Sequence, residues 1–237
     1  MLSDADYVRF ASFFGRPLES FIRDHRNADY PEINHSKSGP ATPLLVRDGA
    51  VHWHWASSHE VEGGAVTMLL GKKAPDVGGE TRFARTSKVY ESLSDKMKHW
   101  SDGLVARHGL GRAPWIEGET EPDPDRPRRQ TDAPDHPLVM AHPVTGRKGI
   151  FTSGTAYGIH GMDDAEEIAL IRELREHIVR SEHRISCKVR AGDIVLWDHF
   201  DAVHGATPTE YSSEQGAVCC TGSAPRACQP STSRVSE

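Results

Sequence analysis

The stretch Val51-His52-Trp53-His54-Trp55-Ala56 gathers two histidines and two tryptophans into six residues and has the pattern of a short β-strand. Alternation along a strand places His52 and His54 on the same face. Imidazole is the commonest metal ligand among side chains, so a histidine that precedes a polar loop is a candidate for a metal site. We therefore expect the fold to be organised around this strand and the functional site to lie at its end.

The overall composition is that of a globular protein. Of the 237 residues, 37% are hydrophobic and 26% are charged, which suits one domain with a substantial core. The formal net charge of −6 argues against non-specific nucleic-acid binding, and no apolar run approaches the ~20 residues that span a bilayer. The acidic start, Met1-Leu2-Ser3-Asp4-Ala5-Asp6, lacks the features of a signal peptide, so we expect a cytoplasmic protein. Reduced thiols are expected for the four cysteines, Cys187, Cys219, Cys220 and Cys228.

Many short apolar or alternating runs predict a mainly β fold with flanking helices, as in a β-sandwich or jelly roll. Strands are expected at residues 43–46, 51–55, 66–70, 138–141, 148–152, 185–189, 193–197, 203–207 and 216–221, and residues 78–83 are expected to form a turn that leads into another strand. Helices are expected at residues 87–100, with Ser87 as N-cap, at 163–180, and as two short pieces within 3–25. Residues 28–41 are predicted to form a loop.

The chain has no internal repeat, and we predict a single domain over residues 1–237. One segment differs in composition: residues 109–134 are rich in proline and charge and almost free of apolar side chains. Such a segment is too polar to bury, and long loops in compact domains are often functional. We therefore predict a long loop or lid at about residues 109–134.

Two histidines stand in contexts that suit a metal site. His54 ends one predicted strand, and His204 lies in the strand after the turn that follows Trp197-Asp198. Strands of a jelly roll can bring two such histidines together, and two imidazoles with one carboxylate form the facial triad of non-haem Fe(II) oxygenases. Spacing alone leaves a packing role open for each histidine.

The wider sequence contains an ordered set of motifs. They are Trp53-His54, Val66-Thr67-Met68-Leu69-Leu70, Pro75, Gly78-Gly79-Glu80-Thr81, His142-Pro143 with Thr145-Gly146-Arg147-Lys148, and Gly192-Asp193-Ile194-Val195-Leu196-Trp197-Asp198 ending in His204. In order and spacing this set resembles the taurine dioxygenase family of Fe(II)/2-oxoglutarate oxygenases, over roughly residues 50–207. The resemblance implies a double-stranded β-helix, the jelly-roll or cupin-like form of this family.

The resemblance also implies Fe(II), 2-oxoglutarate and dioxygen, and it assigns residues to them. His54 and His204 match the two iron-binding histidines, and Thr81 matches the threonine that bonds a carboxylate of 2-oxoglutarate. The family usually places an arginine shortly after the distal histidine, to pair with the far carboxylate, but residues 214–219 contain none. Arg226 is the nearest candidate downstream, because a guanidinium is the natural partner for that carboxylate.

One departure from the family concerns the reaction itself. The family has His-x-Asp at the first ligand, whereas this chain has His54-Trp55-Ala56, and the spacing from His54 to Gly78-Gly79 is that of the family. Ala56 removes a negative ligand and leaves room for a halide ion. The same replacement distinguishes the family's related halogenases, so the resemblance implies that chloride binds beside Ala56 and is transferred to an unactivated carbon of the substrate. Orienting that carbon toward chloride is then the task of the pocket.

Two other functions remain open. A hydroxylase could take its missing carboxylate from Glu60 or another residue, with His52 or His59 as alternative ligands, and a barrel that binds a metal or an effector without catalysis is a different class. We expect His142, His160 and His199 to be structural.

The substrate is expected to be a small anionic metabolite of natural-product biosynthesis. Arg82, Arg85 and the cluster of Arg126, Arg128 and Arg129 could neutralise a phosphate or carboxylate, which favours a phosphorylated compound such as a nucleotide. We expect no nucleic-acid polymer and no membrane as a partner, and the sequence does not define an oligomeric state.

Overall fold

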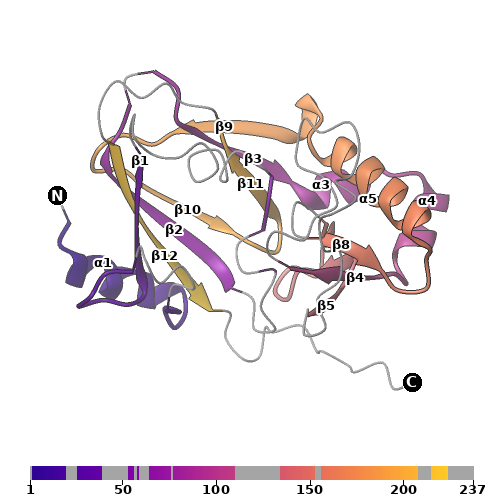
Figure 1. The fold of residues 1–237 in the computed structure, drawn as a ribbon, viewed down its shortest axis with the longest axis horizontal. Coiled ribbons are helices and arrows are strands. Elements are labelled where there is room, and N and C mark those ends of the chain that lie inside the picture. Colours follow the sequence, from indigo (N-terminus) through magenta and orange to yellow (C-terminus); the bar gives the residue numbers. More distant parts are fainter. Residues whose placement is uncertain are drawn as a thin grey trace.

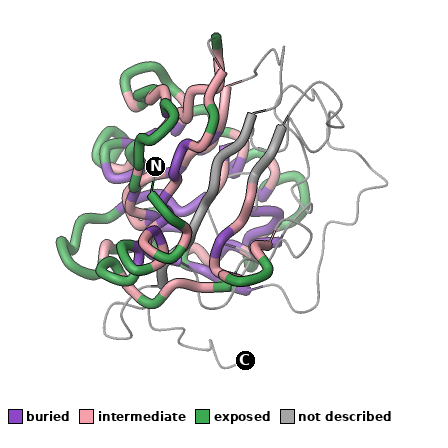
Figure 2. The backbone as a smooth tube through the Cα atoms, turned by 90° about the vertical axis from the view of Figure 1, so that its left-hand side faces the viewer, coloured by how far each residue is buried: buried purple, intermediate pink, exposed green. Residues whose placement is uncertain are grey.

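The computed structural model describes residues 2–19, 26–38, 53–55, 58, 64–75, 77–109, 134–152, 156–207 and 215–223. Within these ranges the protein is mainly β, and its helices lie at the two ends of the molecule with the sheets between them (Figure 1). Buried residues concentrate in the middle of the molecule, and exposed residues follow the loops and outer helices (Figure 2).

Four antiparallel strands form the larger sheet. Its order is β1 (Ile33–Ser38), β12 (Gln215–Ser223), β2 (Gly64–Lys73) and β10 (Ile194–Asp198). The register pairs Trp197 of β10 with Thr67 of β2, so these two side chains share a face.

Three antiparallel strands form a second sheet, in the order β11 (Ala202–Ala206), β3 (Glu80–Arg85) and β9 (Arg184–Lys188). Its register pairs His204 with Phe83 and Ala206 with Thr81. Trp197 reaches across from the larger sheet, because its ring centroid lies 5.3 Å from that of Phe83 and 4.7 Å from that of His204. The two sheets therefore face one another around these rings.

Two smaller sheets complete the described strands. One has the order β5 (Asp135–Pro137), β4 (Val105–His108) and β8 (Ala156–Ile159), and the other is the hairpin of β6 (Val139–Ala141) and β7 (Lys148–Ile150).

The helix α1 (Asp4–Ala11) covers the outer face of the larger sheet. Ser3 caps its first turn, and a short 3-10 turn, η1 (Ser12–Phe14), follows it. Tyr7 and Ala11 of α1 pack with Met68 and Leu70 of β2 in a small buried cluster. Because side chains alternate along β2, Thr67 points the other way, toward the second sheet.

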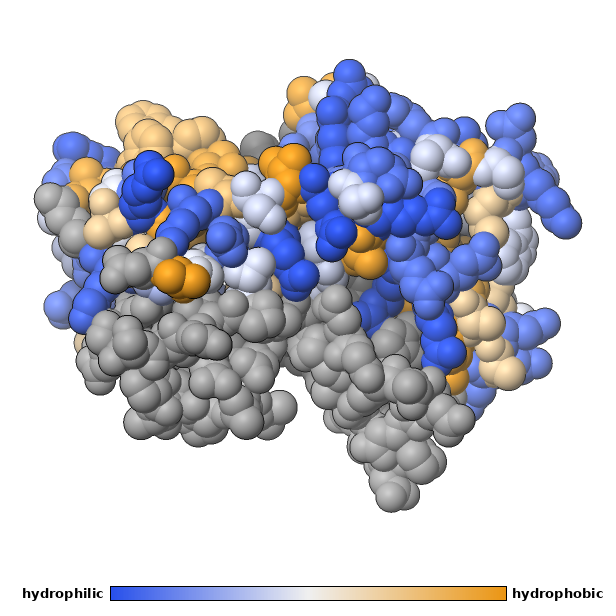
Figure 3. Space-filling view, turned by 90° about the horizontal axis from the view of Figure 1, so that it is seen from above, coloured by the Kyte–Doolittle hydropathy of each residue, from blue (hydrophilic) through white to orange (hydrophobic). Residues whose placement is uncertain are grey.

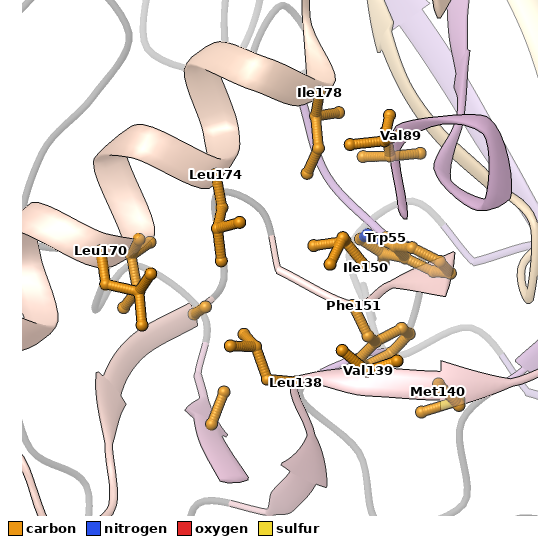
Figure 4. Packing of buried hydrophobic residues seen from close by; sticks show 14 of the residues in the cluster. Trp55, Val89, Leu138, Val139, Met140, Ile150, Phe151, Leu170, Leu174 and Ile178 are labelled. Carbon is orange, nitrogen blue, oxygen red and sulfur yellow. The ribbon is translucent and has the colours of Figure 1, made fainter. Parts of the chain in front are cut away.

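The main hydrophobic core lies under α5 (Asp164–Ile178), as Figure 4 shows. Asp163 caps this helix and forms a capping box with Glu166, as its sequence predicts. The buried stripe of the helix consists of Leu170, Ile171, Leu174 and Ile178. Its other face is charged, and hydrophilic side chains prevail on that side of the molecule when it is seen from above (Figure 3).

The structure corrects several expected elements. The helix predicted at residues 87–100 is two helices, α3 (Thr86–Ser92) and α4 (Asp95–Ser101), because Leu93 is extended and the hydroxyl of Ser94 caps α4 by accepting from the Met97 amide. The predicted N-cap Ser87 lies inside α3. The loop predicted at residues 28–41 contains the edge strand β1, whose polar sequence carries no strand pattern.

Most of the remaining predicted strands are present in the structure. The strands at residues 66–70, 185–189, 193–197, 203–207 and 216–221, the second part of 78–83 and the hairpin of 138–141 and 148–152 are confirmed to within a few residues. Strands β4, β5 and β8 were not predicted, and a second short 3-10 turn, η3 (Ser181–His183), follows α5. Residues 43–46 and most of the predicted lid at 109–134 lie outside the described residues. In the described part of the chain, no helix has the length and apolar character to cross a membrane.

Candidate active site

The structure brings His54 and His204 together. The two residues form an isolated antiparallel bridge in which the His54 amide donates to the His204 carbonyl at 2.8 Å and the His204 amide donates to the His54 carbonyl at 3.1 Å. Their ring centroids are 4.2 Å apart. Because directly paired residues project to the same face of a sheet, the two imidazoles lie side by side, close enough to contact the same small ligand.

The environment of His204 favours a neutral imidazole. Burial, together with the neighbouring rings of His54 and His199, holds the pKa of His204 well below its usual range. The Nδ1 atom of His204 is buried and has no hydrogen-bond partner among the residues that the structure describes. A neutral ring with an unsatisfied nitrogen suits metal coordination, which requires a deprotonated imidazole nitrogen.

The segment that carries His54 is held mainly by side chains. Trp53 and Trp55 are buried, at 3% and 2% exposure, in the main core on the side away from His54. The Trp55 ring lies 4.3 Å from Phe151 between centroids. Further along, the Ser58 hydroxyl donates to the Trp55 carbonyl at 3.2 Å, and Nε2 of His136 lies 3.0 Å from the Ser58 carbonyl. Contacts from several elements thus fix the residues around His54.

Thr81 lies at the end of the ladder between β3 and β11, paired with Ala206, two residues beyond His204. Two glycines with positive φ, Gly78 at 72° and Gly79 at 71°, precede this strand. Glu80 and Thr207 close the end of the ladder through three hydrogen bonds, which we call the Glu80–Thr207 clamp.

In the Glu80–Thr207 clamp, the Thr207 amide donates to the Glu80 carbonyl at 2.8 Å. The Glu80 amide donates to the Thr207 hydroxyl at 3.0 Å, and that hydroxyl donates to the Glu80 carboxylate at 2.9 Å. The end of a ladder otherwise frays, so the clamp keeps the Thr81 backbone in register beside the strand of His204.

The turn between β10 and β11, which leads to His204, is fastened at both ends. At its start, the Asp198 carboxylate accepts from the Phe200 amide at 2.7 Å and lies 2.7 Å from Nε2 of His142. The Nδ1 atom of His142 accepts from the amides of Val144 and Thr145, so Nε2 carries the proton and donates to Asp198.

At the end of this turn, the Asp201 carboxylate accepts from the Ser87 amide at 2.9 Å and from Nε of Arg85 at 2.8 Å. Burial acts to raise the pKa of Asp201, but the hydrogen bonds from Ser87 and Arg85 outweigh it, so the pKa lies below its ordinary value. Asp201 thereby caps α3 from a distant part of the chain. The sequence carried one signal for these contacts, the carboxylates at both ends of a four-residue turn.

The histidine expected to be structural in this region fits that role. His199 is buried, its Nδ1 lies 2.7 Å from the Gly64 carbonyl, and its Nε2 lies 2.6 Å from the Thr67 hydroxyl. Burial lowers its pKa to about 4. The ring is therefore neutral and satisfied by the protein on both sides.

Two arginines expected near an anionic substrate have partners in the protein. Arg85 bonds Asp201, and Nη2 of Arg82 donates to the Ala206 carbonyl at 3.1 Å while its guanidinium stacks over Trp53. Arg82 makes its contacts on the face opposite to the imidazoles, whereas Arg85 lies at the end of β3, beside the turn that leads to His204.

Several predicted site residues lie outside the described residues: Ala56, Arg226, His52, His59 and Glu60, with the arginines of the expected lid. In the described part of the chain, no cluster of three or more histidine, cysteine, aspartate or glutamate side chains is arranged to hold a metal. The described residues therefore bring two imidazoles together and contain no carboxylate arranged with them as a third ligand.

Comparison with known proteins identifies the family. The family model for the taurine catabolism dioxygenases TauD and TfdA matches residues 1–219. The chain belongs to this family. It is thus an oxidoreductase of the Fe(II)/2-oxoglutarate-dependent dioxygenases, as the sequence motifs predict.

Relatives in the TauD/TfdA family agree with this assignment. The chain is 30% identical over 217 residues to the α-ketoglutarate-dependent 2,4-dichlorophenoxyacetate dioxygenase of Cupriavidus pinatubonensis, covering 86% of this chain and 75% of the relative. It is 24% identical over 226 residues to an alkylsulfatase of Acinetobacter baylyi, covering 92% and 68%. α-Ketoglutarate is another name for 2-oxoglutarate.

Solved structures support the fold. The crystal structure of a taurine dioxygenase from Burkholderia xenovorans matches with a TM-score of 0.75 at 25% identity, over 95% of this chain and 73% of that one. The crystal structure of AAD-2 in complex with Mn(II) and N-oxalylglycine matches with a TM-score of 0.76 at 25% identity, over 96% and 80%. The predicted double-stranded β-helix is confirmed.

Proposed function

We propose that this chain oxidises a C–H bond of a small organic anion in a reaction that depends on Fe(II), 2-oxoglutarate and dioxygen. The observation that carries the proposal is the paired arrangement of His54 and His204, with ring centroids 4.2 Å apart on one face of the second sheet. Bound iron would supply the oxidising chemistry: 2-oxoglutarate would lose carbon dioxide and take up one oxygen atom of dioxygen to become succinate, and the remaining oxidising equivalents would convert the substrate C–H bond to the product.

The residues present fit this role. His54 and His204 would hold the metal, since the depressed pKa of His204 keeps its ring neutral at physiological pH. Thr81, kept in register by the Glu80–Thr207 clamp, would donate its hydroxyl proton to a carboxylate of 2-oxoglutarate. Arg226 is the proposed partner of the far carboxylate. These groups bind and orient the cosubstrate, and the oxidation is confined to a carbon that the protein holds nearby.

The names of the relatives support an anionic substrate. They describe enzymes of 2,4-dichlorophenoxyacetate, of (S)-phenoxypropionate and of sulfate esters, all small organic compounds with a carboxylate or sulfate group. Within this class we favour a phosphorylated metabolite, such as a nucleotide, because of the basic cluster at Arg126, Arg128 and Arg129.

The outcome of the oxidation depends on position 56. The relatives described above are named as dioxygenases or a sulfatase and none as a halogenase, which supports hydroxylation, with Glu60 or another carboxylate as the third ligand. The sequence His54-Trp55-Ala56 supports a second candidate, halogenation. Alanine provides no carboxylate, so a chloride ion could take both the coordination position and the negative charge that an aspartate would supply to the metal. Chlorination would consume one C–H bond, chloride, a proton, 2-oxoglutarate and dioxygen and would give water, succinate and carbon dioxide.

The test is a turnover assay with pooled carboxylates, sulfate esters, nucleosides and nucleotides, in the presence of Fe(II), 2-oxoglutarate, dioxygen and chloride. Succinate formation above background supports a 2-oxoglutarate-dependent oxidation of the substrate. A mass gain of one oxygen identifies hydroxylation, and a chlorine isotope pattern that disappears in Ala56→Asp identifies halogenation. If metal binds but no member of the pool yields succinate above background, the chain is a metal-binding barrel and the proposal fails.

A further inference from the structure

Arg82 touches both halves of the candidate site without facing it. Its Nη2 donates to the carbonyl of Ala206, in the strand of His204, at 3.1 Å. Its Cζ lies 4.9 Å from the centroid of the ring of Trp53, the residue before His54. One side chain therefore contacts the strand of one histidine and the immediate neighbour of the other.

The register places Arg82 behind the imidazoles. Phe83 is paired with His204 and shares its face, whereas Arg82 is paired with Gly205 and points to the opposite face. Trp53 is on that opposite face too, at 3% exposure, in the core cluster that includes Ala84 and Val203. Arg82 consequently acts on the histidines through the backbone, by fixing the segments that carry them.

The two histidines differ in how extensively their backbone is paired. His204 lies within β11, which is paired with β3 along five residues, from Ala202 to Ala206. His54 is attached to β11 by an isolated bridge. A cation over a buried indole contributes about as much as a hydrogen bond. The contact between Arg82 and Trp53 is therefore a substantial part of what holds His54 at its distance from His204.

We propose that Arg82 is a positioning residue for the metal site, which sets the separation of His54 and His204 by joining Trp53 to the Ala206 carbonyl. The inference rests on the proposed function in one respect, that the two histidines bind a metal. It differs from the expectation, based on sequence, that Arg82 neutralises an anionic substrate. Loss of an outer partner of a metal site typically weakens metal binding by roughly 10–100-fold, and we expect about tenfold here because the bridge remains.

The experiment is a calorimetric titration of the full chain with Mn(II), without cosubstrate. Four proteins are compared: wild type, Arg82→Met, Arg82→Lys and Arg184→Met, the last removing an exposed arginine from the adjacent strand β9. We expect Arg82→Met to bind Mn(II) about tenfold more weakly, Arg82→Lys to lie between it and wild type, and Arg184→Met to match wild type. Trp53→Leu should weaken binding as well, and adding Arg82→Met to it should have little further effect.

Results that contradict the role of Arg82 can be distinguished from those that contradict the proposed function. If both Arg82 variants bind Mn(II) like Arg184→Met, Arg82 does not position the site. The same holds if Arg82→Met leaves Mn(II) binding unchanged and weakens only N-oxalylglycine, because that pattern belongs to an anion-binding arginine. Should Arg82→Met not fold, Arg82→Lys decides by the same comparison with Arg184→Met. Failure of the wild type to bind Mn(II) would count against the proposed function itself.

Discussion

The two histidines of the candidate site are supported in different ways. His204 lies in a strand whose ladder, preceding turn and far end are all fixed by hydrogen bonds, through Asp198, Asp201 and the Glu80–Thr207 clamp. His54 is held by an isolated backbone bridge and by the packing of Trp53 and Trp55 on either side of it in the sequence. One half of the site is therefore built by backbone pairing, whereas the other half depends on side chains that are packed in the core.

The largest expected effect comes from removing either imidazole. His54→Ala and His204→Ala should each weaken Mn(II) binding by more than the roughly 100-fold that loss of an outer partner causes, since each removes a direct ligand. Calorimetry measures this, with His160→Ala as a control at an exposed histidine in the turn after β8. If His54→Ala bound Mn(II) as tightly as wild type, His54 and His204 would not share a metal ion.

The next effect separates the two kinds of support. Phe151→Ala removes the ring that packs on Trp55 and should lower the free energy of unfolding by about 3 kcal/mol while also weakening Mn(II) binding, because the segment of His54 loosens. Val203→Ala, a buried change within β11, should cost about 2 kcal/mol and affect Mn(II) binding less. Denaturant unfolding and metal titration measure the two quantities. Equal losses of metal affinity would show that the halves do not differ in support.

A smaller effect concerns the cosubstrate. Glu80→Ala removes the carboxylate hydrogen bond of the Glu80–Thr207 clamp and keeps its two bonds to the Glu80 backbone. It should weaken N-oxalylglycine binding to the Mn(II)-loaded protein about fivefold, because Thr81 is held less firmly in register. Glu80→Gln retains an oxygen that accepts from Thr207 and should bind nearly as wild type does, as should Thr145→Val in the hairpin turn. A fivefold loss in Glu80→Gln as well would mean that charge, and not the clamp, is responsible.

The smallest effect is at the turn before His204. Asp201→Ala removes the cap of α3 and should lower the free energy of unfolding by about 1 kcal/mol at neutral pH. The folded protein lowers the pKa of Asp201, so the carboxylate stabilises it above the unfolded pKa, and that stability is lost as the pH falls through the folded pKa. The difference between wild type and Asp201→Ala should therefore shrink on acidification below the ordinary range of a carboxyl group. A difference that stays constant would contradict the capping role.

Part of this architecture is readable from the sequence. Alternating apolar runs predict most strands of the two sheets, and the resemblance to the taurine dioxygenase family points to His54, Thr81 and His204 as site residues. The contacts that fix them were not predictable, because Glu80 and Thr207 meet across 127 residues and no local pattern records such a pairing. Strand β1 was missed because its edge position needs no apolar alternation.

The helix prediction at residues 87–100 shows a related limit. A continuous apolar face suggested one helix, but the cap at Ser94 interrupts it, and the start of α3 is set by Asp201 from a distant turn. Periodicity records which face is buried, and it does not record which remote side chain ends or begins a helix.

In the proposed site, His54 and His204 together hold one metal ion. Crystals of the full chain grown with Mn(II) and N-oxalylglycine would test it most directly, through the anomalous signal of manganese. We predict a peak within bonding distance of both imidazoles, with N-oxalylglycine bound to the metal and one of its carboxylates on Thr81. A manganese peak that contacts neither ring, or only one of them, would show that the two histidines do not share a metal ion.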